Sequence, residues 1–89
     1  MIKTTLTIIN KLGLHARAAA KLVHIAGSFE SDIILRKDGK QANAKSILSV
    51  MMLAAQQGAE IQLEINGIDA AAAQQAIRDL IERRFDEAE

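Results

Sequence analysis

The segment EIQLEIN, residues 60–66, has the clearest strand pattern in this sequence. Its apolar side chains, Ile61, Leu63 and Ile65, alternate with polar ones, which predicts a β-strand with one apolar face and one polar face. Strands of this kind belong to sheets that are covered on one side and solvated on the other, as antiparallel sheets commonly are. We therefore expect an antiparallel sheet with its helices packed on a single face.

Three further segments predict strands. Residues 2–9 alternate, residues 32–37 carry adjacent apolar side chains, and residues 40–44 are short and mostly polar, which suits a sheet edge. Asp38 and Gly39, between the last two segments, are a strong signal for a two-residue hairpin turn, because both turn positions need positive φ. These two segments are therefore expected to pair with each other.

Helical spacing of apolar residues predicts three helices. The first begins at Ala16 and is expected to stop at Gly27 and Ser28, because glycine accepts the left-handed conformation of a helix C-terminus without steric cost. The second is expected to follow Ser46, whose hydroxyl suits an N-cap, and to run through Ala55. Its side chains are apolar nearly all round, so part of its surface should stay exposed.

The third helix is expected to start after Asp69 and to run to about Phe85, with residues 86–89 frayed. Its buried stripe consists of apolar residues three or four positions apart: Ala73, Ala76, Ile77, Leu80, Ile81 and Phe85. The predicted order is strand, helix, strand, strand, helix, strand, helix. This order predicts the α+β class, as a two-layer open-faced sandwich with a four-stranded antiparallel sheet and three helices on one face.

Composition excludes several classes of protein. The sequence has no cysteine, which excludes disulfides, thiolate metal sites and thiol chemistry. The 11 basic and 11 acidic residues balance, and aromatic residues are limited to two phenylalanines, so neither a basic field nor a base-stacking platform indicates nucleic acid. No apolar run approaches membrane length, and the first residues lack a secretory pattern. We expect one cytoplasmic domain, residues 1–89, with no metal site and no cofactor.

Residues 11–20, KLGLHARAAA, contain the candidate for chemistry. His15 stands where the first helix is expected to begin, and Arg17 follows two positions later. A neutral imidazole is a good nucleophile, and the free amides of a helix N-terminus, together with a guanidinium, suit the oxygens of a phosphoryl group. The residues alone leave two interpretations open: His15 accepts a phosphoryl group, or it only caps the helix or lies on the surface.

Two motifs add a resemblance to a known family. The segment LGLHAR, residues 12–17, resembles the active-site signature of HPr, the histidine-containing phosphocarrier family of the bacterial phosphotransferase system. The segment KSILSVMML, residues 45–53, resembles the second-helix motif of that family, and the order of elements agrees along the whole chain. The resemblance implies the open-faced sandwich predicted above, and a phosphocarrier rather than an enzyme.

The resemblance also implies roles for particular residues. His15 would accept a phosphoryl group at Nδ1 from phosphorylated enzyme I and pass it to sugar-specific or regulatory enzyme II-type proteins, and Arg17 would pair with the group. Partners would dock on exposed side chains of the second helix: Ile47, Leu48 and Met51. In some bacteria the serine at the position of Ser46 is also the target of an ATP-dependent HPr serine kinase. We expect a monomer that binds no nucleic acid and enters no membrane.

One position departs from the family pattern. The family most often has proline after the arginine, where this sequence has Ala18. Proline fixes the φ of the first helical turn, whereas alanine gives up that rigidity and restores an amide donor. The departure leaves open how rigidly His15 is held.

Two alternative functions remain open. The nitrogen-related branch of the phosphotransferase system uses a carrier of the same fold and chemistry with mainly regulatory partners. A non-catalytic binding adaptor of this fold is the alternative from another class. The presence of both His15 and Arg17 argues against the adaptor.

Overall fold

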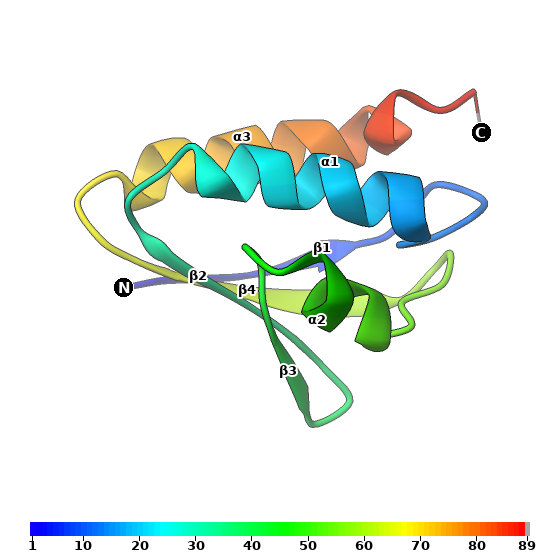
Figure 1. The fold of residues 1–89 in the computed structure, drawn as a ribbon, viewed down its shortest axis with the longest axis horizontal. Helices are drawn as coiled ribbons and strands as arrows, with labels where there is room; N and C mark the ends of the chain where they lie inside the picture. The colour runs from blue at the N-terminus through cyan, green and yellow to red at the C-terminus, as the bar shows by residue number, and fades with distance from the viewer. Residues whose placement is uncertain (89) are drawn as a thin grey trace.

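The computed structural model describes residues 1–88, and the order of its elements is the predicted one. The elements are β1 (Ile2–Thr7), α1 (Ala16–Gly27), β2 (Asp32–Lys37), β3 (Lys40–Asn43), α2 (Ile47–Met52), β4 (Glu60–Asn66), α3 (Ala70–Glu82) and a 3₁₀ turn, η1 (Arg84–Asp86). Figure 1 shows the two long helices, α1 and α3, running side by side over the sheet, with the short α2 beneath α1.

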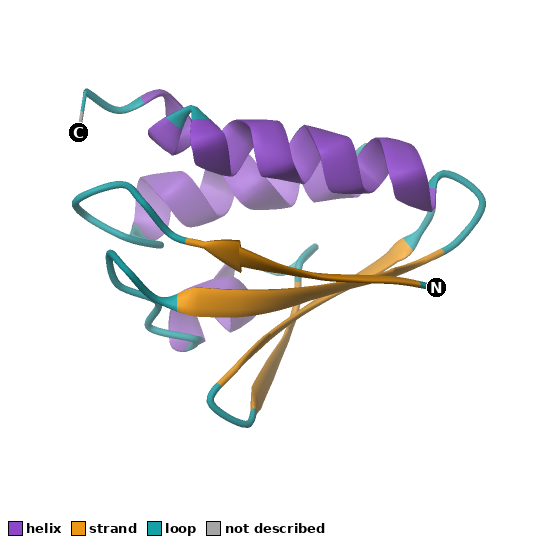
Figure 2. Ribbon diagram, turned by 180° about the vertical axis from the view of Figure 1, so that it is seen from behind, coloured by secondary structure: helices purple, strands orange, loops and turns teal. Residues whose placement is uncertain are grey.

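The sheet is antiparallel throughout, with the strand order β1-β4-β2-β3. The central strand β4 places Leu63 opposite Thr4 of β1 and Leu35 of β2. The three apolar residues of β4 are fully buried, whereas the polar residues between them face away from the helices. Figure 2 shows the molecule from behind, with the two long helices lying above the sheet. The predicted α+β open-faced sandwich is confirmed.

Each helix buries one apolar stripe against this sheet. In α1 the buried residues are Ala18, Ala19, Leu22 and Ala26. In α3 they are Ala70, Ala73, Ile77, Leu80 and Ile81. Small alanines on α1 let the two long helices pack closely, while the larger side chains of α3 fill the space above β1 and β4. Burial of each large aliphatic side chain stabilises the fold by about 1.5–3 kcal/mol.

The predicted hairpin is confirmed. Asp38 has φ 50° and Gly39 has φ 80°, so both central residues adopt the left-handed conformation that a two-residue hairpin requires. The short polar strand β3 lies at the sheet edge, as its composition indicated.

Of two predicted helix ends, one is confirmed in position and the other is wrong. The first helix ends at Gly27 with Ser28 as its C-cap, as predicted, but Gly27 does not adopt the expected positive φ, and the Ser28 hydroxyl donates to the Ile25 carbonyl at 2.6 Å. The second helix ends at Met52 rather than at Ala55, because Ala54 turns to a φ of 52°.

Two further predictions concern the ends of α3. Asp69 occupies the N-cap position, but its carboxylate makes no cap hydrogen bond and instead accepts from Glu30 and Ser31. At the other end, the predicted fraying is wrong for Asp86 and Glu87, because their amides donate to the carbonyls of Arg83 and Arg84, whereas Glu89 lies outside the described residues. None of the helices within residues 1–88 has the length and apolar character needed to span a membrane.

Candidate functional site

The loop between β1 and α1 is fixed by a second loop, residues 54–59. Leu14 donates its amide to the Ala55 carbonyl at 2.9 Å, and Gly13 donates to the Asn10 carbonyl at 3.2 Å. Gly13 has φ 65°, and a Cβ at this position would lie 2.4 Å from the Ala55 oxygen. Only glycine therefore allows the two loops to approach this closely before the chain enters α1.

His15 is the N-cap residue of α1. Its backbone is extended, with φ −71° and ψ 177°, and its carbonyl accepts from the Ala19 amide at 2.8 Å. The ring makes no cap hydrogen bond, so the first three helical amides, those of Ala16, Arg17 and Ala18, have no acceptor within residues 1–88. The His15 imidazole, which is 28% exposed, therefore lies at the positive end of the α1 helix dipole.

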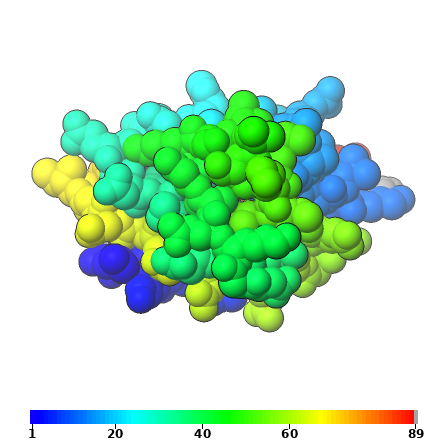
Figure 3. All heavy atoms as spheres, turned by 60° about the horizontal axis from the view of Figure 1, so that its bottom comes forward, coloured from blue at the N-terminus to red at the C-terminus, as the bar shows by residue number. Residues whose placement is uncertain are grey.

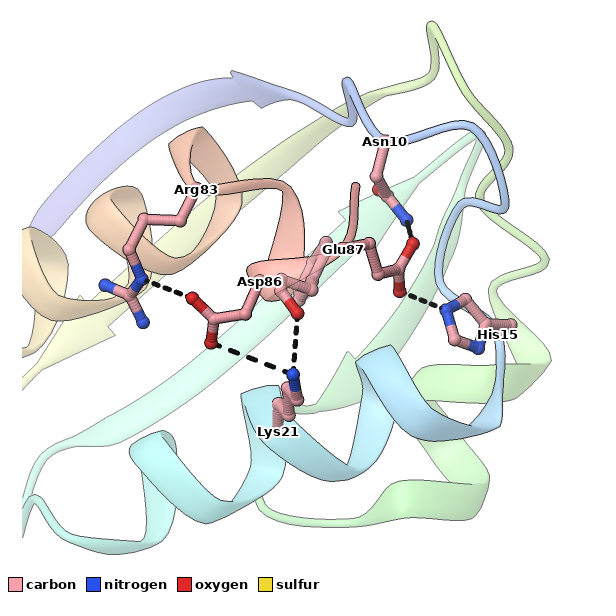
Figure 4. A network of polar contacts seen from close by, with 7 residues as sticks. Asn10, His15, Lys21, Arg83, Asp86 and Glu87 are labelled. Carbon is pink, nitrogen blue, oxygen red and sulfur yellow. Dashed lines mark hydrogen bonds and ion pairs between the residues drawn. The ribbon is translucent and has the colours of Figure 1, made fainter. Parts of the chain in front are cut away.

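Glu87 contacts the His15 ring from the C-terminal segment, 72 positions along the chain (Figure 4). Its Oε2 forms a hydrogen bond with Nε2 of His15, and its Oε1 accepts from Asn10 Nδ2 at 3.1 Å. Burial by itself raises the pKa of the Glu87 carboxyl, but the hydrogen bonds from His15 and Asn10 outweigh that effect and leave the pKa below its usual value of 4.5. The carboxyl is therefore ionised at neutral pH.

Asn10 connects this carboxylate to the Gly13 turn. It is fully buried, and its Nδ2 donates to the Gly13 carbonyl at 2.8 Å as well as to Glu87. Both neighbours are acceptors, so the reverse orientation of the amide would place oxygen against oxygen. Oδ1 of Asn10 has no hydrogen-bond partner within residues 1–88, at a cost of about 1–3 kcal/mol. The Asn10 amide nitrogen thus donates to two acceptors, the Gly13 carbonyl and the Glu87 carboxylate.

A left-handed turn brings Glu87 to the site. Arg84, Phe85 and Asp86 have φ 56°, 54° and 62°, a conformation that costs about 1–2 kcal/mol per residue for side chains other than glycine. The Phe85 side chain is fully buried, which offsets about 1.5–3 kcal/mol of that cost.

Two cationic side chains hold the same turn (Figure 4). Lys21 of α1 donates to the Phe85 carbonyl at 2.7 Å and lies 3.7 Å from the Asp86 carboxylate. Arg83 donates from Nε to Asp86 Oδ1 at 3.0 Å. The hydrogen bond from Arg83 is the main cause of the lowered pKa of Asp86, with the charges of Arg83 and Lys21 adding to it against the opposing effect of burial. The C-terminal segment is therefore tied to both long helices.

Arg17 is exposed and makes no hydrogen bond or ion pair with residues 1–88. It lines a groove of about 400 Å³ between α1 and α3, together with Lys21, His24 and Arg83. Its guanidinium is therefore available to an anion, but it makes no hydrogen bond with the His15 ring.

The exposed apolar side chains of α2 form one surface, which we call the α2 patch: Ile47, Leu48, Met51 and Met52. Leu48 and Met52 are each 69% exposed, whereas Val50 and Leu53 are buried in the core. In Figure 3 the green segment of α2 occupies the middle of the visible face, and the blue segment that leads into α1 lies beside it. The expectation that the second helix is only partly buried is confirmed.

Ser46 is the N-cap of α2. Its Oγ accepts from the Ser49 amide at 3.4 Å, and its side chain is partly buried. The predicted capping role is confirmed, and its hydroxyl lies at the start of the α2 patch.

The site thus contains residues that sequence reasoning had not assigned to it. Glu87 was expected to be frayed, and neither Asn10 nor Lys21 was among the predicted site residues. The NKLG turn at residues 10–13 was a usable signal for Asn10, but no local pattern marks Glu87. Within residues 1–88, no group of three or more histidine or carboxylate side chains could hold a metal ion.

Comparison with known proteins finds similar sequences and structures. A family model described as the PTS HPr component phosphorylation site matches residues 2–83. The phosphocarrier protein HPr of Xylella fastidiosa (strain Temecula1) is 51% identical over 87 residues, covering 98% of each chain. The phosphocarrier protein NPr of Shewanella violacea is 45% identical, covering 98% of this chain and 96% of its own.

Solved structures match over the whole length. HPr-C-His from Thermoanaerobacter tengcongensis superimposes with a TM-score of 0.96 at 45% identity, covering 100% of both chains. A structure described as an HPr dimer from the same organism gives a TM-score of 0.79 at 46% identity, covering 98% of this chain and 100% of its own. The overall fold is therefore that of these relatives.

Proposed function

This chain belongs to the HPr family, the phosphocarriers of the phosphotransferase system, and on that premise we propose that His15 is the residue that carries the phosphoryl group. The observation that best supports this proposal is the position of the imidazole, partly exposed at the start of α1 beside three amides without acceptors. Free amides at a helix start stabilise phosphate oxygens, so the site suits the phosphorylated product.

Arg17 has the complementary role in this proposal. Its guanidinium is permanently charged, exposed and unpaired within residues 1–88, so it can swing to the phosphoryl oxygens and donate two hydrogen bonds. The three amides and Arg17 together offset the negative charge that arrives with the group.

Enzyme I is the proposed donor, and sugar-specific or regulatory enzyme II-type proteins are the proposed acceptors. We propose that they dock on the α2 patch, in which Ile47, Leu48 and Met51 are the central contacts. Exposed apolar surface of this kind marks interaction sites, and flexible methionines adapt to partners of different shape. The carrier is proposed to act as a monomer and a single domain in the cytoplasm.

Ser46 gives a proposed point of regulation. A phosphate on its hydroxyl would add about two negative charges at the start of the α2 patch and weaken association with acidic partners. Mass spectrometry of the protein from its native cell tests this, because phosphoserine is stable to acid and phosphohistidine is not. Absence of the serine phosphate under all growth conditions would contradict the proposal.

The nitrogen-related branch is the second candidate function, favoured by the 45% identity to an NPr. Both branches require the same His15 chemistry but different donors. The purified protein is offered the enzyme I of each branch, charged from labelled phosphoenolpyruvate, and the initial rates are compared. Faster labelling by the sugar-branch donor supports the leading proposal, and faster labelling by the other donor overturns it.

The assignment of His15 is tested in the same assay. One acid-labile, base-stable phosphate is expected per wild-type chain, and none in His15→Ala. The matched control is His24→Ala, which removes the other histidine, an exposed residue of α1, and should label normally. Labelling that persists in His15→Ala would show that another residue carries the group.

A further inference from the structure

We propose that Glu87 is a positioning residue for phosphoryl transfer: its carboxylate keeps the proton of neutral His15 on Nε2 and so leaves the Nδ1 lone pair free to attack phosphorus. This inference rests on the proposed function of His15 and adds to it a residue from the opposite end of the chain. Its basis is a set of hydrogen bonds that link the ring, the carboxylate and Asn10 (Figure 4).

The assignment of the proton follows from the donors and acceptors. An ionised carboxylate can only accept hydrogen bonds, so the Nε2 of His15 must donate to Glu87. A neutral imidazole has a single N–H, and placing it on Nε2 leaves Nδ1 with its lone pair. Nδ1 has no hydrogen-bond partner within residues 1–88, so nothing in the described chain competes for that lone pair.

The carboxylate is itself held in place. Asn10 donates to its second oxygen at 3.1 Å, and the orientation of the Asn10 amide is fixed by the Gly13 carbonyl. The preceding turn is anchored by the buried Phe85 ring and by the hydrogen bond from Lys21 to its carbonyl. A carboxylate fixed on both sides keeps the ring orientation constant, which a loose C-terminus could not do.

The same contact suits the chemical step. The Nδ1 lone pair forms the new bond to phosphorus while the bond from phosphorus to the donor protein breaks, with its electron pair remaining on the donor. The proton on Nε2 stays where it is, so the ring gains a positive charge, and the Glu87 carboxylate lies against that charge. On transfer to the acceptor, the Nδ1–phosphorus bond breaks and its electron pair returns to Nδ1. In serine proteases a buried aspartate likewise holds the catalytic histidine in one tautomer and stabilises the positive charge that forms on its ring.

A purely structural role is the alternative interpretation. Glu87 could tether the C-terminal segment without influencing the ring. The two interpretations differ in what Glu87→Gln does, because a glutamine amide has the same shape but can either accept from Nε2–H or donate to a bare Nε2. The tether would persist in this variant, whereas the preference for one tautomer would be lost.

The matched control is Glu82→Gln. Glu82 is an exposed residue of α3 that makes no hydrogen bond or ion pair with residues 1–88, so this variant changes the net charge equally without touching the ring. Glu82→Gln should change neither the ¹⁵N shifts of the His15 ring nor the rate of phosphoryl transfer.

The first measurement is ¹⁵N NMR of the His15 ring in the unphosphorylated protein, at a pH where the imidazole is neutral. In the wild type, Nε2 is expected at the shift of a protonated nitrogen and Nδ1 at that of an unprotonated one. In Glu87→Gln the two shifts should move toward each other. Wild-type shifts that place the proton on Nδ1, or shifts that are identical in both proteins, would overturn the proposal.

The second measurement is the rate of phosphoryl transfer from phosphorylated enzyme I. We expect kcat/KM to fall about tenfold in Glu87→Gln, the lower end of what loss of a histidine's hydrogen-bond partner costs at metal sites, with most of the loss in kcat. An unchanged rate would overturn the positioning role while leaving His15 as the carrier. Labelling that survives in His15→Ala would instead overturn the proposed function, so the two failures are distinguishable.

Discussion

Gly13 determines how the chain enters the helix that carries His15. Its φ of 65° and the proximity of the Ala55 carbonyl together leave no room for a side chain. The neighbouring Leu14 amide uses the same carbonyl, so the glycine and the hydrogen bond form one structural unit. At this position a single methyl group should disturb both the stability and the site.

We predict that Gly13→Ala lowers the free energy of unfolding by about 2–5 kcal/mol, the sum of a strained φ and an overpacked contact. Urea denaturation measures this change. Gly27→Ala is the control, because a Cβ there meets nothing within 4 Å and φ is not positive, so it should raise stability by about 0.4–1 kcal/mol. Equal effects of the two variants would contradict the argument.

At the scale of elements, Asp69 connects the start of α3 to the turn between α1 and β2. Its carboxylate accepts from the Glu30 amide at 2.8 Å, from the Ser31 amide at 3.0 Å and from the Ser31 hydroxyl. The Ser31 hydroxyl is the main cause of its lowered pKa, followed by the Glu30 amide. The three hydrogen bonds therefore favour the ionised form in the folded state.

A pH dependence of stability follows from that lowered pKa. The Asp69 contribution is complete above its ordinary pKa of 3.8, and is lost as the pH falls below that value and through the lower pKa of the folded state. We predict that the stability difference between the wild type and Asp69→Asn shrinks in this acid range, measured by urea denaturation at a series of pH values. Asp32→Asn, at an exposed carboxylate that makes no side-chain hydrogen bond with residues 1–88, should show no such convergence.

The short helix α2 contributes mainly to the surface of the protein and little to its core. Only Val50 of its six residues is buried, and the rest of the helix presents the α2 patch or its polar edge. It ends early because Ala54 turns left-handed, which brings the Ala55 carbonyl to the Leu14 amide. The turn that ends α2 therefore supplies a hydrogen-bond acceptor to the β1–α1 loop.

We predict that Met51→Glu raises the Kd for enzyme I about tenfold or more, because it places a charge in the centre of an apolar contact. Isothermal titration calorimetry gives the affinity, and circular dichroism should show an unchanged fold, since Met51 is 39% exposed. Ala72→Glu adds the same charge at an exposed position of α3 and should bind normally. Unchanged affinity in Met51→Glu would remove the α2 patch from the docking surface.

At the scale of the whole molecule, local sequence signals predicted the two layers of the fold but not the contacts that join segments far apart in the chain. Alternation in residues 60–66 and the pair Asp38 and Gly39 act over a few positions, and these predictions are confirmed. The end of α2 depended on a contact with Leu14, about 40 positions earlier, and its prediction was wrong. Propensity rules describe what a segment favours by itself, and tertiary contacts overrode them here.

The same reasoning explains which part of the site was predictable. His15, Arg17 and the α2 patch lie in two continuous motifs, so spacing and resemblance could identify them. Glu87 reaches His15 only through three consecutive left-handed residues, a conformation that arginine and phenylalanine do not favour. Part of its cost is offset by burial of Phe85, which depends on the assembled core. No pattern in the C-terminal residues could have indicated that outcome.

The effect of the C-terminal segment on the His15 ring should therefore be separable from its effect on the free energy of unfolding. We predict that Phe85→Ala lowers the free energy of unfolding by about 3–5 kcal/mol and also moves the His15 ring ¹⁵N shifts, because the segment that carries Glu87 loses its anchor. Leu80→Ala, at a residue of α3 that is 1% exposed, should cost about 2–5 kcal/mol and leave those shifts unchanged. If both variants moved the shifts equally, the ring would be responding to the stability of the whole fold, and the Phe85 anchor would have no specific connection to the site.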